Sequence, residues 1–430
     1  MKKDQTISPF RVLLPVGIGT CLSLLGDASL YAVLPTRTID AGVSVASVGI
    51  LLSANRFVRL ILNGPVGIVY DHWRHRRLFV LALFIGACST AIYGLTQGFW
   101  PLLAGRLLWG LAWAGIWIGG NTIILDIARD DNRGRWVGIY QATYFLGSSG
   151  GSLLGGFLTD RLGYPQMMVV GASLTLIGAL VALIFLPETR ALRQEAAEFI
   201  VSPRHSPPEN ANVSNPYGKV AFALVTALYG ANRFALAGVF SSTFALFLLE
   251  QIGDRVHIAE RPLGIATLAG LALGLSKLIS MASAPIVGGL SDRISSRWRV
   301  AVGGLVPGVA GFSLLAIASP LAILVGVPLV AITGGSNQGL STALLGDLGN
   351  VGRRSRQLGL MFTVGDLASA VGPLLAYALI PLLGIKGVYL LSAGVLASMF
   401  LVALRWAVRP MHICQLSELH KEIDHDYIEP

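Results

Sequence analysis

Long stretches of hydrophobic residues alternate with short polar segments along the whole chain. Twelve such stretches lie at 12–35, 46–70, 78–97, 101–125, 136–159, 166–186, 219–249, 262–290, 300–318, 320–345, 357–382 and 387–408. A helix rises about 1.5 Å per residue, so about twenty residues cross the ~30 Å hydrocarbon core of a bilayer. The pattern therefore predicts an all-α membrane protein with twelve transmembrane helices.

An internal repeat relates the first six stretches to the last six. At a constant offset of 221 residues, Gly67 aligns with Gly288 and Gly163 with Gly384. Two related halves of six helices are typical of transporters built from repeats. The expected parts are two pseudo-symmetric six-helix bundles at 1–186 and 219–408, a cytoplasmic linker at 187–218 and a cytoplasmic tail at 409–430.

The composition of the chain agrees with a membrane protein. Hydrophobic residues make up 53% of the 430 residues and charged residues 13%, against about 25% charged residues in soluble domains. The net charge of +9 does not indicate nucleic-acid binding, because the basic residues lie in short loops between apolar stretches. Cys21 and Cys88 lie inside apolar stretches, which disfavours a disulfide framework. The first stretch reaches Pro35 without a small-residue cleavage site, so we interpret it as a retained helix.

The distribution of arginines predicts the orientation in the membrane. Loops 71–77, 126–135, 292–299 and 353–356 each contain three arginines, and loops rich in arginine face the cytoplasm. Both termini are then cytoplasmic, and we expect a monomer in the inner (plasma) membrane. The tail contains His412, Cys414, His420 and His425. We interpret it as a solvated amphipathic tail, with metal binding as the alternative.

The polar segments after the second helix of each half resemble the loop signature of the major facilitator superfamily, Gly-x-x-x-Asp-Arg-x-Gly-Arg-Arg. The first copy has Gly67, Asp71, Arg76 and Arg77, with His72 and Arg74 at the two positions that depart from the signature. The second copy has Gly288, Asp292, Arg293 and Arg297.

The resemblance implies a conformational latch in each half. Small residues permit close helix approach, which we expect of the two signature glycines. The resemblance adds Asp126 and Asp347, at the ends of the fourth and tenth helices, to the latch aspartates. The alternative is that these charges only set the topology.

The fourth and fifth helices carry the remaining resemblance. Arg106 and Gly110 resemble an Arg-x-x-x-Gly element that is linked to proton coupling in the superfamily, and helical spacing places Trp113 and Trp117 on the side of Arg106. The alternative for the tryptophans is a packed or lipid-facing stripe. The fifth helix is similar to the antiporter signature of the superfamily through Gly138, Gly147, Gly151, Gly155 and Gly156. Ser152 stands where proline is usual, and Gly372-Pro373 in the second half keeps the proline.

Together these motifs identify the chain, over about 12–408, as resembling a twelve-helix major facilitator protein, nearest the drug:proton antiporter branch. Seven charged residues lie inside the predicted helices, namely Asp27, Arg56, Arg59, Arg106, Arg233, Lys277 and Asp366. Isolated charges in the membrane are costly, so these residues must pair or line a wet cavity near the midplane. All seven histidines lie in predicted loops or tails, which leaves Asp27 and Asp366, with Arg106, as the proton-coupling candidates.

The excess of cations suggests an anionic substrate. The substrate-binding candidates are Arg56, Arg59, Arg233, Lys277, Trp113 and Trp117. The alternative is that Arg56 and Lys277 pair with the two aspartates and only hold helices together.

Three functional classes follow from these observations. The favoured one is a secondary active transporter working by alternating access, with proton-coupled export of a small molecule. The alternatives are an importer or exchanger of an anionic metabolite and a non-transporting membrane sensor or scaffold. The sequence shows no nucleophile–base pair, metal-ligand cluster or phosphate loop, so an enzyme is disfavoured and no cofactor or metal is expected. The expected partners are the substrate, protons and the lipid bilayer.

Overall fold

The computed structural model describes residues 9–128, 133–190, 216–258, 261–294, 297–348 and 354–408. The helices of the first half are α1 (Pro9–Val33), α2 (Val45–His72), α3 (His75–Leu95), α4 (Phe99–Ile127), α5 (Arg133–Leu162) and α6 (Tyr164–Phe185). The second half begins with α8 (Pro216–Asn232), the π-helix η1 (Arg233–Phe240) and α9 (Ser241–Ile252), followed by the strands β1 (Arg255–Ile258) and β2 (Arg261–Gly264). It continues with α10 (Ile265–Arg293), α11 (Arg297–Gly303), α12 (Val306–Ile317), α13 (Pro320–Leu348) and α14 (Arg354–Val408).

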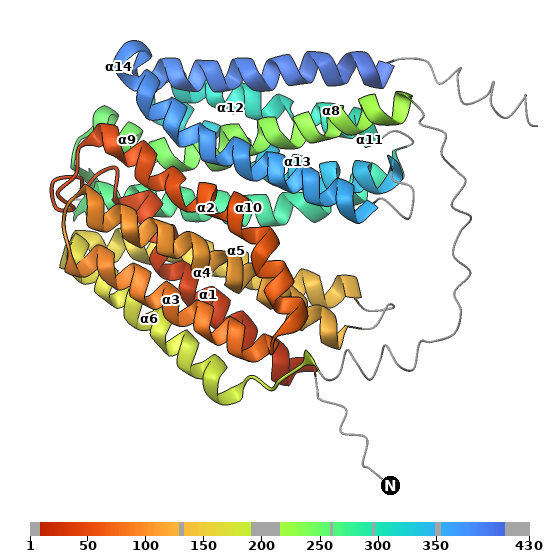
Figure 1. The fold of residues 1–430 in the computed structure, drawn as a ribbon. Coiled ribbons are helices and arrows are strands. Elements are labelled where there is room, and N and C mark those ends of the chain that lie inside the picture. The colour runs from red at the N-terminus through yellow and green to blue at the C-terminus, as the bar shows by residue number, and fades with distance from the viewer. Residues whose placement is uncertain are drawn as a thin grey trace, which may run out of the picture.

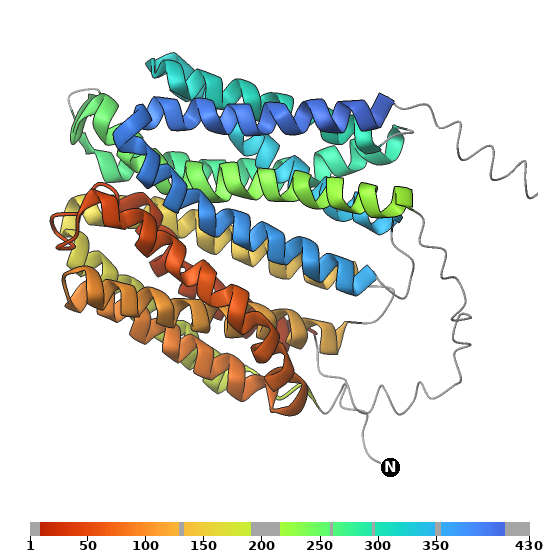
Figure 2. The ribbon, with the colours of Figure 1, turned by 45° about the horizontal axis from the view of Figure 1, so that its top comes forward.

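Two groups of helices lie side by side along a common direction. In both ribbon views the helices α1 to α6 lie together, and α8 to α14 form a second group beside them (Figures 1 and 2). The groups contact each other mainly through α5 against α10 and α2 against α14. The expected linker falls largely on residues 191–215 and the tail on 409–430, which lie outside the described residues.

The repeat is visible in the helix boundaries. Shifting α2 by the 221-residue offset gives residues 266–293, one residue shorter than α10 at 265–293, and shifting α5 gives residues 354–383, the first part of α14. The offset also aligns Gly163 and Gly384, which have φ angles of 91° and 66°. Glycine tolerates this left-handed conformation without steric cost. The helix therefore breaks at Gly384, so α14 is two spans.

The predicted all-helical fold is confirmed. Among the described residues, ten helices are long and apolar enough to cross a bilayer. One of the ten, at residues 357–407, is divided by the break at Gly384. The 30-residue α5 is long enough but is not among the ten, because polar residues and glycines lower its hydropathy. These segments occupy the positions of the twelve predicted stretches.

A short hairpin between α9 and α10 departs from the prediction. The sequence predicted a loop over 250–261 and a helix from residue 262, but β1 and β2 pair antiparallel and α10 begins at Ile265. The helix starts later because residues 261–264 are held in the extended strand β2 by their pairing with β1. We call the end of the bundle with this hairpin the hairpin end. The opposite end, with Asp71, Arg76, Asp292 and Arg297, is the arginine end.

Glycines allow close packing of α5 on both sides. A Cβ atom built on Gly147 would lie 2.6 Å from the carbonyl oxygen of Cys21, and one on Gly151 would lie 2.7 Å from that of Leu24, both on α1. Gly155 is in similarly close contact with α1, and Gly156 with α10 of the other half. Larger side chains would separate these helices, so the glycine spacing of α5 has a packing role.

Three other glycines lack a close neighbour within the described part of the chain in this conformation, so the close approach expected at the two signature glycines is not seen here. A Cβ on Gly67, Gly138 or Gly288 would meet no atom within 4 Å among the described residues. All three lie towards the arginine end.

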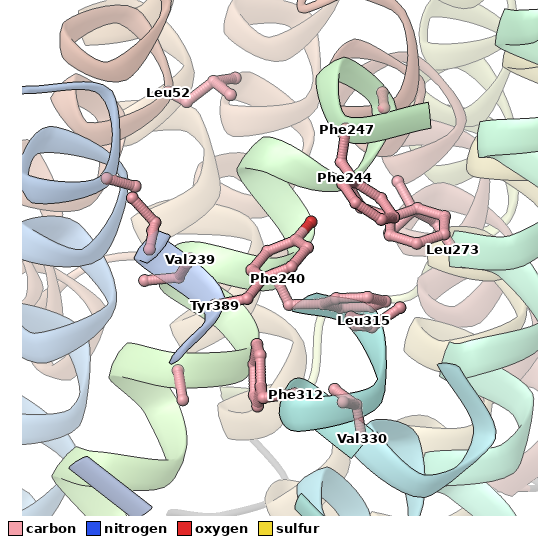
Figure 3. Close-up of a cluster of buried hydrophobic side chains, with 14 of the residues drawn as sticks. Leu52, Val239, Phe240, Phe244, Phe247, Leu273, Phe312, Leu315, Val330 and Tyr389 are labelled. Atoms are coloured by element: carbon pink, nitrogen blue, oxygen red, sulfur yellow. The ribbon is translucent and has the colours of Figure 1, made fainter. Parts of the chain in front are cut away.

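An aromatic cluster forms the core of the second half. Phe240, Phe244, Phe312 and Tyr389 lie together, with ring centroids 4.9 Å apart for Phe240 and Phe244 and 5.8 Å apart for Phe312 and Tyr389 (Figure 3). This packing joins η1 and α9 to α12 and to the last span of α14.

Candidate functional site

A cavity of about 90 Å³ lies between the two halves near the middle of the bundle. It is lined by Leu24, Asp27, Ala28, Tyr31, Asn55, Arg56, Arg59, Trp109, Trp113, Tyr144, Ser148, Ser152, Arg233, Ala237, Ser241, Leu273 and Lys277. We call it the central cavity. Of the predicted binding residues, Arg56, Arg59, Arg233, Lys277 and Trp113 line it, whereas Trp117 does not.

A second cavity of about 80 Å³, which we call the side cavity, extends into the second half. It shares six lining residues with the central cavity, namely Tyr144, Arg233, Ala237, Ser241, Leu273 and Lys277. Its remaining polar lining includes Asn232, Ser276, Ser280 and Gln338. The two cavities therefore meet at a boundary that carries two cations.

Asp27 pairs with Arg106 inside the first half. The Nη1 atom of Arg106 lies 2.5 Å from Oδ1 of Asp27, and the guanidinium also donates to Leu51 O at 3.0 Å and to the Tyr31 hydroxyl at 3.2 Å. Only 1% of the Arg106 side chain is exposed. A buried guanidinium needs such a full set of partners. Asp27 faces the central cavity, while Arg106 lies behind it.

Asp366 pairs with an arginine of the opposite half. Its Oδ1 lies 2.5 Å from Nη2 of Arg59 on α2 and 3.9 Å from Nη2 of Arg233 on η1. This ion pair joins α2 to α14 across the interface between the halves. Any motion that separates the halves at this level must break it, whereas the Asp27–Arg106 pair moves within one half.

Arg56 is a buried cation whose partners are neutral. Its guanidinium donates to the carbonyl oxygen of Ala237 at 2.7 Å and to that of Ser369, and it lies over the Tyr31 ring at 5.3 Å. Its exposed fraction is 8%. The accepting carbonyl of Ala237 belongs to the π-helix, and such π-segments are frequent at functional sites.

Lys277 has no ion-pair or hydrogen-bond partner among the described residues, and it lines both cavities. The two intramembrane aspartates are paired with Arg106, Arg59 and Arg233. The alternative that Arg56 and Lys277 pair with these aspartates is therefore wrong in this structure. The cavity walls carry positive charge that the described carboxylates do not compensate.

Aromatic side chains form the first-half wall of the central cavity. Trp109, Trp113 and Trp117 stack along α4, with ring centroids 6.2 and 5.6 Å apart and interplanar angles of 20° and 21°. Tyr144 of α5 packs against Trp113 at 5.9 Å. The tryptophan stripe is thus packed in the protein, and its Trp113 end reaches the cavity.

At the hairpin end, a polar cluster joins the halves. Arg37 pairs with Asp160 at 2.9 Å and with Asp254 of the second half at 3.3 Å. Oδ2 of Asp160 also accepts from the backbone N–H of Thr267 at 2.8 Å and from its hydroxyl at 2.7 Å. The sequence interpretation missed this cluster. The only available signal was the presence of opposite charges in loops at the same end.

The hydrogen bonds between the halves are unevenly distributed. Among the described residues, those that cross the interface are the Asp160–Thr267 bonds, Ser149 to Gly274 O at 2.9 Å, the Arg56 bonds and Arg59–Asp366. All lie at the hairpin end or near the middle of the bundle. The halves are therefore joined at the hairpin end and near the middle.

The predicted latch residues form different clusters in the two halves. In the second half, Arg297 lies 2.7 Å from Oδ1 of Asp292 and 2.8 Å from Oδ1 of Asp347. Arg293 takes part in no ion pair among the described residues.

In the first half, the partner of Asp126 is His75. Nδ1 of His75 lies 2.7 Å from Oδ2 of Asp126, which also accepts from the Thr189 hydroxyl at 2.6 Å. Both members of the ion pair have side chains that are 1% exposed. The prediction that every histidine lies in a loop or tail is wrong for His75, which begins α3 and is buried.

The other first-half latch residues lie at the surface. Arg76, the repeat equivalent of Arg297, donates to the carbonyl oxygen of Leu183. Asp71 and Arg77 are exposed, and neither side chain takes part in an ion pair among the described residues. Asp126 is therefore the only predicted latch aspartate of the first half that is paired within the described part of the chain.

Comparison with known proteins bears on both the fold and the class. A family model described as Major Facilitator Superfamily matches residues 16–335 and 222–413. The Escherichia coli protein described as "Uncharacterized MFS-type transporter YcaD" is 32% identical over 178 residues, which are 41% of this chain and 45% of that protein. The matched segment thus spans about half the length of this curated relative.

Solved structures resemble the whole chain at low sequence identity. A bacterial homolog of the human lysosomal transporter Spinster, in an inward-facing and occupied conformation, has a TM-score of 0.75 at 16% identity, covering 93% of this chain and 97% of that one. The nucleoside transporter NupG has a TM-score of 0.69 at 14% identity, covering 91% and 98%. The human organic anion transporter MFSD10 has a TM-score of 0.64 at 19% identity, covering 92% and 99%. At these identities the likeness concerns the fold.

Proposed function

The chain belongs to the Major Facilitator Superfamily of membrane transporters, and on that premise we propose that it exports a small organic anion by alternating access, in exchange for protons. The observation that carries the proposal is the pair of cations without carboxylate partners, Arg56 and Lys277, on the wall of the central cavity. A cation in a poorly hydrated cavity is stabilised by a bound anion, and it repels a bound cation. The site therefore suits a carboxylate or phosphate group better than a lipophilic cation.

The distribution of contacts supports alternating access. Alternating access requires that contacts at one end of the bundle break while contacts at the other end form. The Arg37–Asp160–Asp254 cluster would hold the hairpin end closed. Gly67 and Gly288, which have open space around them here, would permit close approach when the arginine end closes. The arginine-rich loops at that end favour a cytoplasmic position for it.

Asp366 is the carboxylate that we propose for coupling. Protonation of Asp366 would remove the negative charge that holds Arg59 across the interface at 2.5 Å. The protonation state would then bias the separation of the halves, which is what a coupling group must do. Asp27 has less influence on that motion, because its partner Arg106 belongs to the same half. Export is proposed from the resemblance of α5 to the antiporter helix.

Counterflow in proteoliposomes tests the anion proposal. Proteoliposomes that contain the purified protein are loaded with one unlabelled organic anion or cation at a time. The uptake of the same compound in labelled form is then measured. Replacing Arg56 or Lys277 singly by Gln should weaken binding of the preferred anion by tenfold or more, as expected for the loss of a charge-assisted bond. Lys386, an exposed residue at the start of the span after Gly384, provides a matched Lys→Gln control. A preferred substrate that is a lipophilic cation, bound equally well by both variants, would refute the proposal.

A further inference from the structure

We propose that the central and side cavities form one binding site for an aromatic 2-hydroxycarboxylate, a substrate class that rests on the proposed transport of organic anions. The two cavities have volumes of about 90 and 80 Å³ and adjoin each other at six shared lining residues. A void of about 150 Å³ is large enough to take up benzene. The joined cavities therefore have room for one ring and a short polar arm.

The boundary between the cavities is the position for the carboxylate. Arg233 and Lys277 line both cavities there. The Nε atom of Arg233 is buried and has no hydrogen-bond partner among the described residues. Tyr144 also lies at the boundary, and its hydroxyl takes part in no hydrogen bond within the described part of the chain. Two cations and a phenolic donor thus line the boundary between the cavities, where a carboxylate would satisfy them.

The central cavity, on the first-half side of the boundary, provides the position for an aromatic ring of the ligand. Trp113 lines the central cavity and is held by stacking on Trp109 and Trp117 and by contact with Tyr144. Tyr31 lies on the same wall, under the guanidinium of Arg56. Rigid aromatic side chains next to a cavity offer faces and edges on which a ring packs in offset or edge-to-face geometry.

The side cavity, on the second-half side of the boundary, provides the position for a hydrogen-bond donor of the ligand. Asn232 lines the side cavity, is 2% exposed, and donates from Nδ2 to Gly334 O at 3.2 Å. Its Oδ1 atom is buried and has no partner among the described residues. A buried acceptor without a partner is costly, and a hydroxyl group of a ligand would satisfy it.

The arrangement determines the chemistry of the ligand. The ring and the donor lie on opposite sides of the carboxylate position, so the donor belongs on the carbon next to the carboxylate. An ammonium group at that carbon would be repelled by Arg233 and Lys277, whereas a hydroxyl group would not. The ligand that fits all three positions is therefore an aryl-substituted 2-hydroxy acid, for which 3-phenyllactate is a suitable probe.

Calorimetric titration of the purified full-length protein tests this assignment with four probes. The protein should bind 3-phenyllactate about tenfold more tightly than 3-phenylpropionate, which lacks the hydroxyl group, and more tightly than phenylalanine or lactate. Trp113→Leu should weaken the binding of 3-phenyllactate by about tenfold and leave that of lactate unchanged. Trp100→Leu is the matched control, because Trp100 is 76% exposed.

A substitution at Asn232 tests the donor position through the preference between two ligands. Both ligands are measured with the same variant, so a smaller folded fraction does not change the preference. Asn232→Asp keeps the acceptor and adds a negative charge, so it should shift the preference from 3-phenyllactate towards phenylalanine by tenfold or more. Lactate binding as tightly as 3-phenyllactate, or an unchanged preference in Asn232→Asp, would overturn the assignment while leaving the anion proposal intact. Failure of every anionic probe and of other anions to bind would instead refute the proposed function itself.

Discussion

Replacing Asp126 by Asn should destabilise the protein far more than replacing Asp347 by Asn, although the two aspartates occupy the same position of the repeat. Asp126 and its partner His75 have side chains that are only 1% exposed. Asp347 is 54% exposed, and its partner Arg297 is 31% exposed. The two pairs therefore differ in access to water.

The expected magnitudes follow from this difference in burial. Removing one partner of a buried ion pair costs about 3–5 kcal/mol, because the other charge is left without compensation. Asp126 also accepts from the Thr189 hydroxyl at 2.6 Å, so its loss affects the segment that follows α6 as well. An exposed pair contributes about 0–1 kcal/mol, and Arg297 keeps Asp292 at 2.7 Å when Asp347 is replaced.

Thermal unfolding of the purified protein in detergent, followed by tryptophan fluorescence, measures the difference. For a unit of 150–250 residues, 1 kcal/mol corresponds to roughly 2–4 °C in Tm. Asp126→Asn should therefore lower Tm by roughly 6–20 °C, and Asp347→Asn by roughly 4 °C at most. Equal decreases in Tm for the two variants would show that the buried His75–Asp126 pair does not contribute as the structure indicates.

Three further predictions concern transport and packing. Asp366→Asn should abolish accumulation driven by a proton gradient and leave substrate exchange intact, and retained accumulation in proteoliposomes would exclude Asp366 as the coupling group. Asp292→Asn should slow transport more than it weakens substrate binding, because Asp292 contacts Arg297 outside the cavity; we expect the same direction and a smaller effect for Asp71→Asn, and wild-type rates in both variants would contradict the latch. Gly151→Ala should destabilise the protein by about 1–3 kcal/mol, because its Cβ would lie 2.7 Å from a main-chain oxygen of α1. Gly138→Ala, with open space around it, should instead be neutral or stabilising by up to about 1 kcal/mol, and equal Tm values for these two alanine variants would contradict the packing role.

The sequence alone determined the helices, the repeat and the class of the protein. In lipid every backbone polar group must be satisfied within the segment, so an apolar stretch of about twenty residues has few alternatives to a helix. The predicted stretches 357–382 and 387–408 left Gly384 in a loop, as 136–159 and 166–186 left its repeat equivalent Gly163, and both glycines adopt positive φ. The cost of a charge in the membrane likewise placed Arg56 and Lys277 in the protein interior, where the structure has them on one cavity.

Only the tertiary structure decided which charges pair. Asp27 pairs with Arg106, and Asp366 pairs with Arg59 of the other half. Hydropathy patterns do not distinguish these ion pairs from pairs with other intramembrane cations. A periodic pattern reports which side of a helix is apolar, but the partner of a side chain depends on which helices pack together and at what depth. The same limit explains why His75, and not Arg76, meets Asp126. It also explains why the side cavity with Asn232 was not foreseen, because its walls come from α5, α8, η1, α9, α10 and α13, which are brought together only by folding.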